Sequence, residues 1–175
     1  MVDELSDPRR ADTVSFFSGV GEQASYDAWL DWHRITLLLK CEGLDDAGRR
    51  ATPIPTSRLS LHGLVRHMAE VERGWFRRTI GGEDIGHIHD YSSDEDADFD
   101  LTTAVWDDDV ATWQAEIDAA RAVAAARTPD DEGTHARTGK VVSLRWVYVH
   151  MIEEYARHNG HADLIRELVD GAVGD

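Results

Sequence analysis

Histidine and glutamate side chains recur along one face of a predicted helix near the C-terminus. Counting about 100° per residue from His150, Glu154 follows at about 40° and His158 at about 80°. His161 falls on the same arc, at about 20°. A helix in a folded domain normally fills such a stripe with Leu or Ile, because burying unpartnered polar groups costs free energy. A bound cation would compensate these groups, so the stripe predicts a metal site.

Glu154 and His158 are four residues apart, which lets both side chains reach one ion from a single helix. His67 lies in an earlier helical segment, inside an apolar pattern that turns it inward. That pattern consists of Leu64, Met68, Val71 and Trp75. Two imidazoles and one carboxylate suit zinc, and also nickel or ferrous iron, with a position left for water or substrate. The same Glu–His spacing also forms a plain hydrogen bond, so the residues alone leave both interpretations open.

Four long helical segments must position these residues, and they span residues 25–42, 60–80, 104–127 and 143–169. Ser60 and Ser143 are suitable N-caps, and glycine follows three of the segments, at Gly43, Gly81 and Gly171. Apart from a short stretch at 140–142, nothing suggests pairing as a strand. The predicted fold is therefore all-α: a four-helix bundle forming a single domain over residues 1–175, with an N-terminal arm at 1–23 and long loops between the helices.

Two of these loops differ in character. The connection 44–59 contains Pro53 and Pro55, which predicts an extended chain. The connection 83–103 is strongly acidic and carries His87 and His89. We interpret it as a solvated loop rather than a metal-binding one, because aspartate-rich loops are usually solvated.

Several single residues have simpler interpretations. Cys41, the only cysteine, is expected to be a small packed residue rather than a nucleophile. No partner is evident for His33, His62 or His135, so all three are expected to be exposed. The tryptophans expected in the core are Trp29, Trp75 and Trp146, one of which could border a pocket.

The charge of the chain excludes one class of partner. Thirty-four acidic residues against eighteen basic ones give a net charge of −16. Nucleic-acid binding normally needs a basic surface, so no nucleic acid is expected as a partner. No apolar run is long enough to cross a membrane, and a single cysteine fits a reducing compartment. A cytoplasmic protein that acts on a small molecule is expected.

Two blocks of sequence resemble the DinB-like superfamily. They are Gly63–Trp75 and Glu153–Glu167. In particular, the chain resembles the actinobacterial branch that includes the mycothiol-dependent maleylpyruvate isomerases and the mycothiol S-transferases. The resemblance extends over nearly the whole chain and implies a metal-binding four-helix bundle.

The resemblance also implies which residues bind the metal. The commonest ligand set of the superfamily is one His on the second helix and an HxxxH pair on the last. His67 matches the first of these, and His158 matches the second His of the pair. Glu154 stands where the first His of the pair is expected, and a His, Glu, His set resembles that of the mycothiol-dependent isomerases. His150 and His161 match no ligand position and are expected beside the ligands.

The implied activity is a metal-dependent reaction of a low-molecular-weight thiol such as mycothiol with a small electrophile, as an S-transferase or an isomerase. Two alternatives stay open. A hydrolase of a small amide or thiol conjugate would use metal-activated water, with Glu153 or Glu70 as base. A non-catalytic metal-binding protein would have its coordination sphere closed by His150 or His161. The apolar outer faces of such helices would permit a homodimer.

Overall fold

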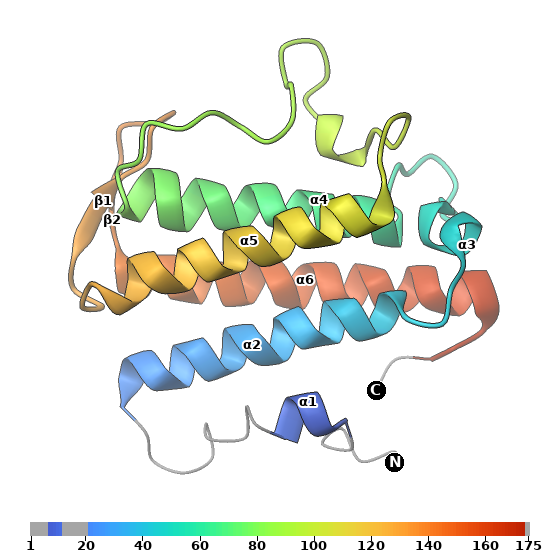
Figure 1. Ribbon diagram of the computed structural model, residues 1–175, viewed down its shortest axis with the longest axis horizontal. Coiled ribbons are helices and arrows are strands. Elements are labelled where there is room, and N and C mark those ends of the chain that lie inside the picture. Colours follow the sequence, from blue (N-terminus) through green and yellow to red (C-terminus); the bar gives the residue numbers. More distant parts are fainter. Residues whose placement is uncertain (1–6, 12–20, 174–175) are drawn as a thin grey trace. The chain divides into compact units, whose positions relative to one another are not determined.

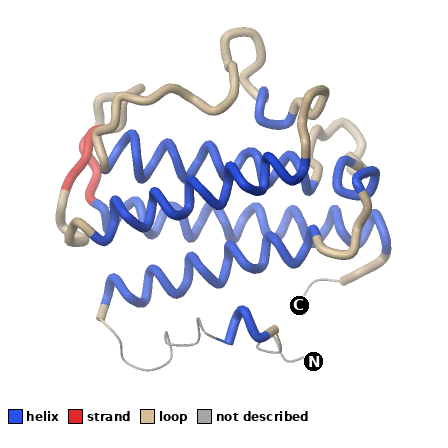
Figure 2. The backbone as a smooth tube through the Cα atoms, in the orientation of Figure 1, coloured by secondary structure: helices blue, strands red, loops and turns tan. Residues whose placement is uncertain are grey.

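The computed structural model describes residues 7–11 and 21–173 and is mostly helical (Figure 1). The α-helices are α1 (Pro8–Ala11), α2 (Glu22–Cys41), α3 (Asp46–Arg50), α4 (Leu61–Glu72), α5 (Trp106–Ala125) and α6 (Leu144–Asp170). A π-helix, η2 (Arg73–Ile80), continues α4, and a 3₁₀ turn, η3 (Ala97–Phe99), interrupts the long connection before α5. The strands β1 (Glu132–Thr134) and β2 (Val141–Ser143) form a small antiparallel sheet, visible among the helices and loops of Figure 2. The prediction of a helical fold is thus confirmed, with this short hairpin added.

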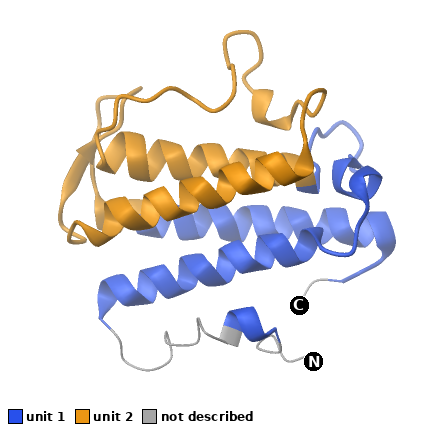
Figure 3. Ribbon diagram, in the orientation of Figure 1, with its two compact units in different colours: residues 1–61, 148–175 blue, residues 62–147 orange. Residues whose placement is uncertain are grey.

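The chain divides into two compact units, residues 1–61 with 148–175 and residues 62–147 (Figure 3). Within the first unit, α2 and α6 run parallel. Three pairs of residues show this direction, and their numbers rise together along both helices: Asp27 with Tyr148, His33 with Asn159, and Lys40 with Asp163. The core of this unit is apolar and includes Leu30, Leu37, Met151, Tyr155 and Ile165.

The described part of the N-terminal arm packs on α2 in the same unit. Arg10 of α1 is buried, donates a hydrogen bond of 2.8 Å to Thr36 and lies over the ring of Trp32. Residues 1–6 and 12–20 of the predicted arm lie outside the described residues.

The second unit is built on α4, η2 and α5, which also run parallel. Arg66 pairs with Asp109 at one end, and Arg73 pairs with Glu116 about two turns further along both helices. Leu64, Met68, Phe76, Trp113 and Ile117 fill the interior. The hairpin packs against η2 through Gly133, where a Cβ atom would lie 2.1 Å from the carbonyl oxygen of Thr79. Only glycine allows this approach.

The predicted helix ends agree with the structure to within a few residues. Gly43, Gly82 and Gly171 have positive φ angles and follow α2, η2 and α6, as expected of residues that stop a helix. Ser143 caps α6, since its hydroxyl accepts a hydrogen bond of 3.2 Å from the backbone N–H of Trp146.

Three predictions about local structure are wrong. The connection 44–59 is not extended throughout, because Asp45 caps the short helix α3 by accepting from the N–H of Gly48 at 2.8 Å. The second half of the predicted helix 60–80 is a π-helix, in which Gly81 N–H donates to the carbonyl five residues earlier, at Phe76. Trp29 and Trp146 are 41% and 45% exposed rather than core residues.

Within the described ranges, no helix is both long enough and apolar enough to cross a membrane.

Candidate functional site

Four polar side chains of α6 lie in a chain of contacts. Glu154 Oε2 is 3.3 Å from Nε2 of His158, and Glu154 Oε1 is 3.5 Å from Nε2 of His150. His161 continues the chain on the other side, with its Nδ1 3.4 Å from Nδ1 of His158. Helical spacing places these residues on adjacent turns of one face, as their sequence positions indicate. One carboxylate is therefore shared between two imidazoles.

The residues of this chain differ in exposure. His158 is 9% exposed, and the side chain of Glu154 is 18% exposed. Burial, together with the nearby charges of His158 and Arg157, lowers the pKa of His161 below its usual value. The stripe is thus a partly buried polar strip along one face of α6.

His and carboxylate ligand atoms on α6 gather into groups that could hold a metal ion. One group consists of His150, Glu153 and Glu154, whose ligand atoms lie within 4.8 Å of one another. Glu154 and His158 belong together to a second such group. Imidazole nitrogen and carboxylate oxygen are donors that zinc and its neighbours accept.

His67, the third predicted ligand, is oriented by an aspartate in the second unit. Its Nδ1 lies 2.6 Å from Oδ2 of Asp98, a residue that is only 4% exposed. Because an ionised carboxylate only accepts hydrogen bonds, Nδ1 carries the proton and Nε2 is the nitrogen that would ligate a metal. Phe99 stacks on the imidazole with ring centres 5.5 Å apart. This carboxylate–imidazole pair is the usual support of a metal-binding histidine.

Asp98 comes from the acidic loop 83–103, which is therefore not merely a solvated segment. Arg66 donates to its carbonyl oxygen at 2.9 Å, which ties η3 to α4. Tyr91 also hydrogen-bonds to the Asp98 carboxylate; burial, then the charges of Asp98 and Glu70, raise the pKa of Tyr91 far above its usual range. The tyrosine stays a neutral donor. His89 lies in the same region, 3.2 Å from Arg66, and burial followed by the charge of Arg66 lowers its pKa.

Another histidine of α4 is wholly buried, contrary to the expectation that it is exposed. His62 places Nε2 2.8 Å from Oδ2 of Asp109, and Arg66 holds the other oxygen of that carboxylate at 2.9 Å. Burial alone would raise the pKa of Asp109, but its hydrogen bonds and charge contacts with His62 and Arg66 outweigh it and lower the pKa. His62 therefore joins α4 to α5 rather than facing solvent.

The structure contradicts the expected exposure of His33 and His135 but agrees with the expected packing of Cys41. His33 and His135 are half-buried rather than exposed: the first contacts Asn159 and the second contacts Trp75. Cys41 is 1% exposed, and burial raises the pKa of its thiol to about 12. The interpretation of Cys41 as a packed residue rather than a nucleophile therefore agrees with its surroundings.

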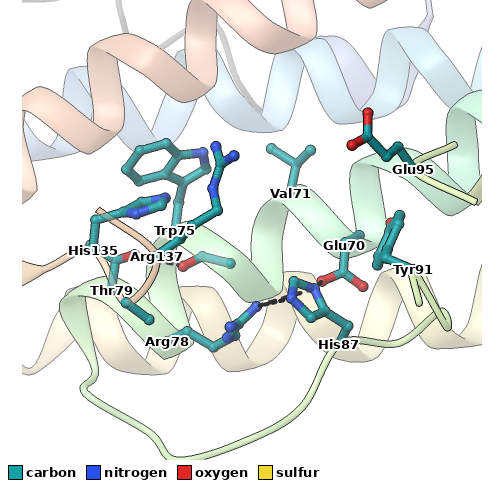
Figure 4. Close-up of a pocket in the computed structure, with 12 residues that line it drawn as sticks. Glu70, Val71, Trp75, Arg78, Thr79, His87, Tyr91, Glu95, His135 and Arg137 are labelled. Atoms are coloured by element: carbon teal, nitrogen blue, oxygen red, sulfur yellow. Dashed lines mark hydrogen bonds and ion pairs between the residues drawn. The ribbon is translucent and has the colours of Figure 1, made fainter. Parts of the chain in front are cut away.

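The second unit also contains a pocket of about 590 Å³ along the face of α4 and η2 (Figure 4). Its floor begins at Glu70 and Val71, one turn beyond His67 on α4. The loop 83–103 supplies one wall, and the turn between β1 and β2 supplies another. Trp75 lies in this pocket, with its ring centre 5.0 Å from that of His135.

Neither the role of Asp98 nor the pocket was predicted from the sequence. Asp98 is one of many aspartates in its loop, and nothing in the spacing of those residues distinguishes it. The pocket brings together residues from three separate segments, so no local sequence pattern predicts it. The only signal was the helical recurrence of Val71 and Trp75 on the face that carries His67.

Comparisons with known proteins agree with this picture. The family whose sequence description is Mycothiol-S-transferase matches residues 25–171. The match begins within α2 and ends directly after α6, so it includes His67, Glu154 and His158. A comparison with curated proteins found no match. With well over half of its length matched, the chain belongs to the mycothiol S-transferase family.

Proposed function

We propose that this protein joins mycothiol, or a similar low-molecular-weight thiol, through its sulfur to a small electrophile in a metal-dependent reaction. The observation that carries the proposal is the family match over residues 25–171, which includes every residue of the proposed metal site. An isomerase is the close variant, in which the thiol adds to an activated double bond and then leaves.

The proposed ligands are His67, Glu154 and His158, with zinc as the expected ion and nickel or iron as alternatives. Three properties of the chain support this set. Glu154 and His158 already lie 3.3 Å apart, Asp98 fixes the tautomer of His67, and the donor atoms are those that zinc prefers. A bound divalent ion would lower the pKa of a coordinated thiol, so that the thiolate forms at neutral pH.

The chain's own residues then have positioning roles. Asp98 accepts the Nδ1 proton of His67 and keeps that imidazole in the tautomer that presents Nε2. His150 contacts Glu154 and His161 contacts His158, so each of these histidines helps to orient its neighbour. Tyr91 donates to Asp98, which leaves that carboxylate with hydrogen bonds from two elements.

We further propose that α2, α4 with η2, α5 and α6 form one four-helix bundle in a single domain. The proposal agrees with the superfamily resemblance and with the apolar faces that each of these helices buries. A cytoplasmic location suits an enzyme that uses a reduced thiol. Leu164 and Leu168, exposed on α6, would permit a homodimer.

The contacts of two carboxylates favour thiol chemistry over hydrolysis. A hydrolase would need a base such as Glu70 or Glu153. Glu70 accepts from the ring of His87 at 2.6 Å and from the N–H of Ile88 at 2.7 Å, while Glu153 pairs with Arg157 on the surface of α6. Both carboxylates are therefore engaged by donors of the chain itself.

The test is a rate measurement with a defined electrophile. Zinc-loaded protein is mixed with mycothiol and 1-chloro-2,4-dinitrobenzene; the thiolate sulfur bonds to the ring carbon, chloride leaves, and the thiol proton goes to solvent. We expect a metal-dependent acceleration that is lost in His158→Ala. If mycothiol and other thiols react no faster than the uncatalysed background, the transferase proposal is wrong. Retention of the rate after complete removal of metal would refute the metal dependence alone.

A further inference from the structure

The pocket of the second unit holds two arginines without an acidic partner. Among the described residues, neither Arg78 nor Arg137 forms an ion pair with a carboxylate. Arg78 donates at 3.1 Å to Nε2 of His87, and Nδ1 of that ring in turn donates to Glu70. Arg137 is exposed at the rim. Figure 4 shows the guanidinium group of Arg137 beside the indole of Trp75 and that of Arg78 directed towards His87.

The other arginines near Arg78 on η2 do have acidic partners. Arg73 pairs with Glu116 at 2.6 Å, and Arg77 pairs with both Glu116 and Glu83. Carboxylates are abundant in a chain of net charge −16, and Arg73 and Arg77 form ion pairs with them. Arg78 and Arg137 form no such pair with a described residue.

Positively charged side chains surround the end of the pocket at His135. Burial lowers the pKa of His135 first, and the charges of Arg137, Arg78 and Lys140 lower it further. The imidazole therefore stays neutral at pH 7, where it can donate or accept a hydrogen bond without adding charge.

The acidic side of the pocket is satisfied within the protein. Both oxygens of Glu70 accept hydrogen bonds, from His87 and from Ile88. Glu95 is exposed at the far rim, beside Tyr91 in Figure 4. A ligand anion placed near Trp75 would therefore meet guanidinium groups rather than carboxylates.

The pocket also offers an apolar surface beside these cations. Trp75 presents an indole ring that is tilted against His135, and Val71 lies one helical turn before it. The volume of about 590 Å³ is that of a small-molecule site. Aromatic rings pack well against indole, and planar guanidinium groups match the geometry of a carboxylate.

We propose that this pocket binds a small aromatic carboxylate, with its ring on Trp75 and its carboxylate held by Arg78 and Arg137. The inference goes beyond the proposed function, because it requires neither a metal nor a thiol. Since the floor of the pocket starts one turn from His67, such a molecule would occupy the same helix face as that residue.

The test measures binding of 2-naphthoate to metal-free protein by isothermal titration calorimetry, with uncharged 2-naphthamide as the matched probe. We expect naphthoate to bind at least about tenfold more tightly than the amide, since a charge-assisted hydrogen bond contributes that much. Arg137→Ala and Arg78→Ala should each weaken naphthoate binding about tenfold and leave amide binding unchanged. The control is Arg121→Ala, which removes an exposed arginine of α5 that pairs with Asp118 and should leave both affinities unchanged.

Three results would overturn the proposal: no binding of naphthoate to the wild-type protein, equal affinity for acid and amide, or equal weakening in the Arg121→Ala control. Arg137 is exposed and forms no ion pair with a carboxylate in the part of the chain that the structure describes, so its variant keeps the test valid if Arg78→Ala unfolds. Because the protein is metal-free, a negative result here says nothing against thiol transfer. Conversely, loss of transferase activity in another variant leaves this proposal intact.

Discussion

The carboxylate of Asp98 lies 2.6 Å from Nδ1 of His67, although thirty-one positions separate the two residues in the sequence. One comes from α4 and the other from a short 3₁₀ turn in an acidic loop. Asp98 is buried, so its charge must be compensated, and His67, Tyr91 and the neighbouring Arg66 surround it. The cost of burying the aspartate is thus offset by contacts that also fix the orientation of the histidine.

Replacing Asp98 should weaken the proposed metal site without removing a ligand. In Asp98→Asn the amide oxygen can still accept from Nδ1, but the charge that increases the basicity of His67 is lost. We expect the affinity for zinc to fall about 10- to 100-fold, as measured by competition with a chromogenic chelator. Asp90→Asn, an exposed residue of the same loop, should bind zinc as the wild type does. Wild-type affinity in Asp98→Asn would show that this carboxylate does not support a metal ligand.

The two proposed ligands on α6 should respond differently to substitution. His158→Ala removes a donor and should abolish stoichiometric metal in the purified protein, determined by elemental analysis. Glu154→His should keep the metal, because it restores the HxxxH pair that is commoner in the superfamily. His135→Ala serves as the control, since this histidine lies in the pocket with Trp75 and should not change the metal content. Full metal retention in His158→Ala would refute the ligand assignment.

Stability should depend on the glycine of the hairpin. A Cβ atom at Gly133 would lie 2.1 Å from the carbonyl oxygen of Thr79, and 2.8 Å from the Cα of Ile80. Gly133→Ala must push β1 away from η2, and we expect the free energy of unfolding to fall by about 1–3 kcal/mol. Urea denaturation measures this change. Gly86→Ala, where a Cβ would meet nothing within 4 Å, should change stability by less than about 0.5 kcal/mol. Equal stability of the two variants would contradict the packing of β1 on η2.

Acid should destabilise the protein through His33. Burial, with a smaller effect of the Arg10 charge, lowers the pKa of His33 to about 4 in the folded protein. In the unfolded chain the pKa is about 6.5, so between these values the unfolded state binds more protons. The free energy of unfolding should therefore decrease as the pH falls from 6.5 towards 4, by up to roughly 3 kcal/mol from this group.

The variant His33→Gln isolates this effect, because glutamine does not titrate and its side-chain oxygen can accept from Asn159. The stability difference between wild type and variant should be constant above pH 7 and should change steadily below 6.5. Urea denaturation at a series of pH values measures both regions. A difference that stays constant down to pH 4 would mean that His33 titrates normally.

The helices were predictable because their ends carry residues with strong local preferences. Gly43, Gly82 and Gly171 adopt positive φ angles that other residues avoid, and Ser143 supplies the hydroxyl that a helix start needs. The stripe of His150, Glu154, His158 and His161 was visible for a similar reason, since helical spacing alone places these residues in contact. The choice of His67 as their partner came from the apolar pattern around it and from the superfamily resemblance, and it stays a prediction.

The remaining features depend on contacts between distant segments. The burial of His62 needs Asp109 of α5, and the role of Asp98 needs His67 of α4. The π-helix η2 directly continues α4, and the spacing of apolar residues in the sequence does not distinguish the two helix types. Trp146 is not a core residue. Its half-exposed ring packs on that of Trp75, with the ring centres 5.1 Å apart.

The parallel direction of α4 and α5 explains why the chain has a long acidic loop at all. Neighbouring antiparallel helices can be joined by a few residues, but a parallel pair obliges the chain to travel back along the full length of the first helix. The 20 residues from Leu61 to Ile80 span about 30 Å, a distance that roughly 10 extended residues cover. The return path here, residues 81–105, is about two and a half times that long, and the surplus lets it fold into η3 beside His67. Shortening this path to its minimum would keep the helices connected while removing the segment from which Asp98 reaches the histidine.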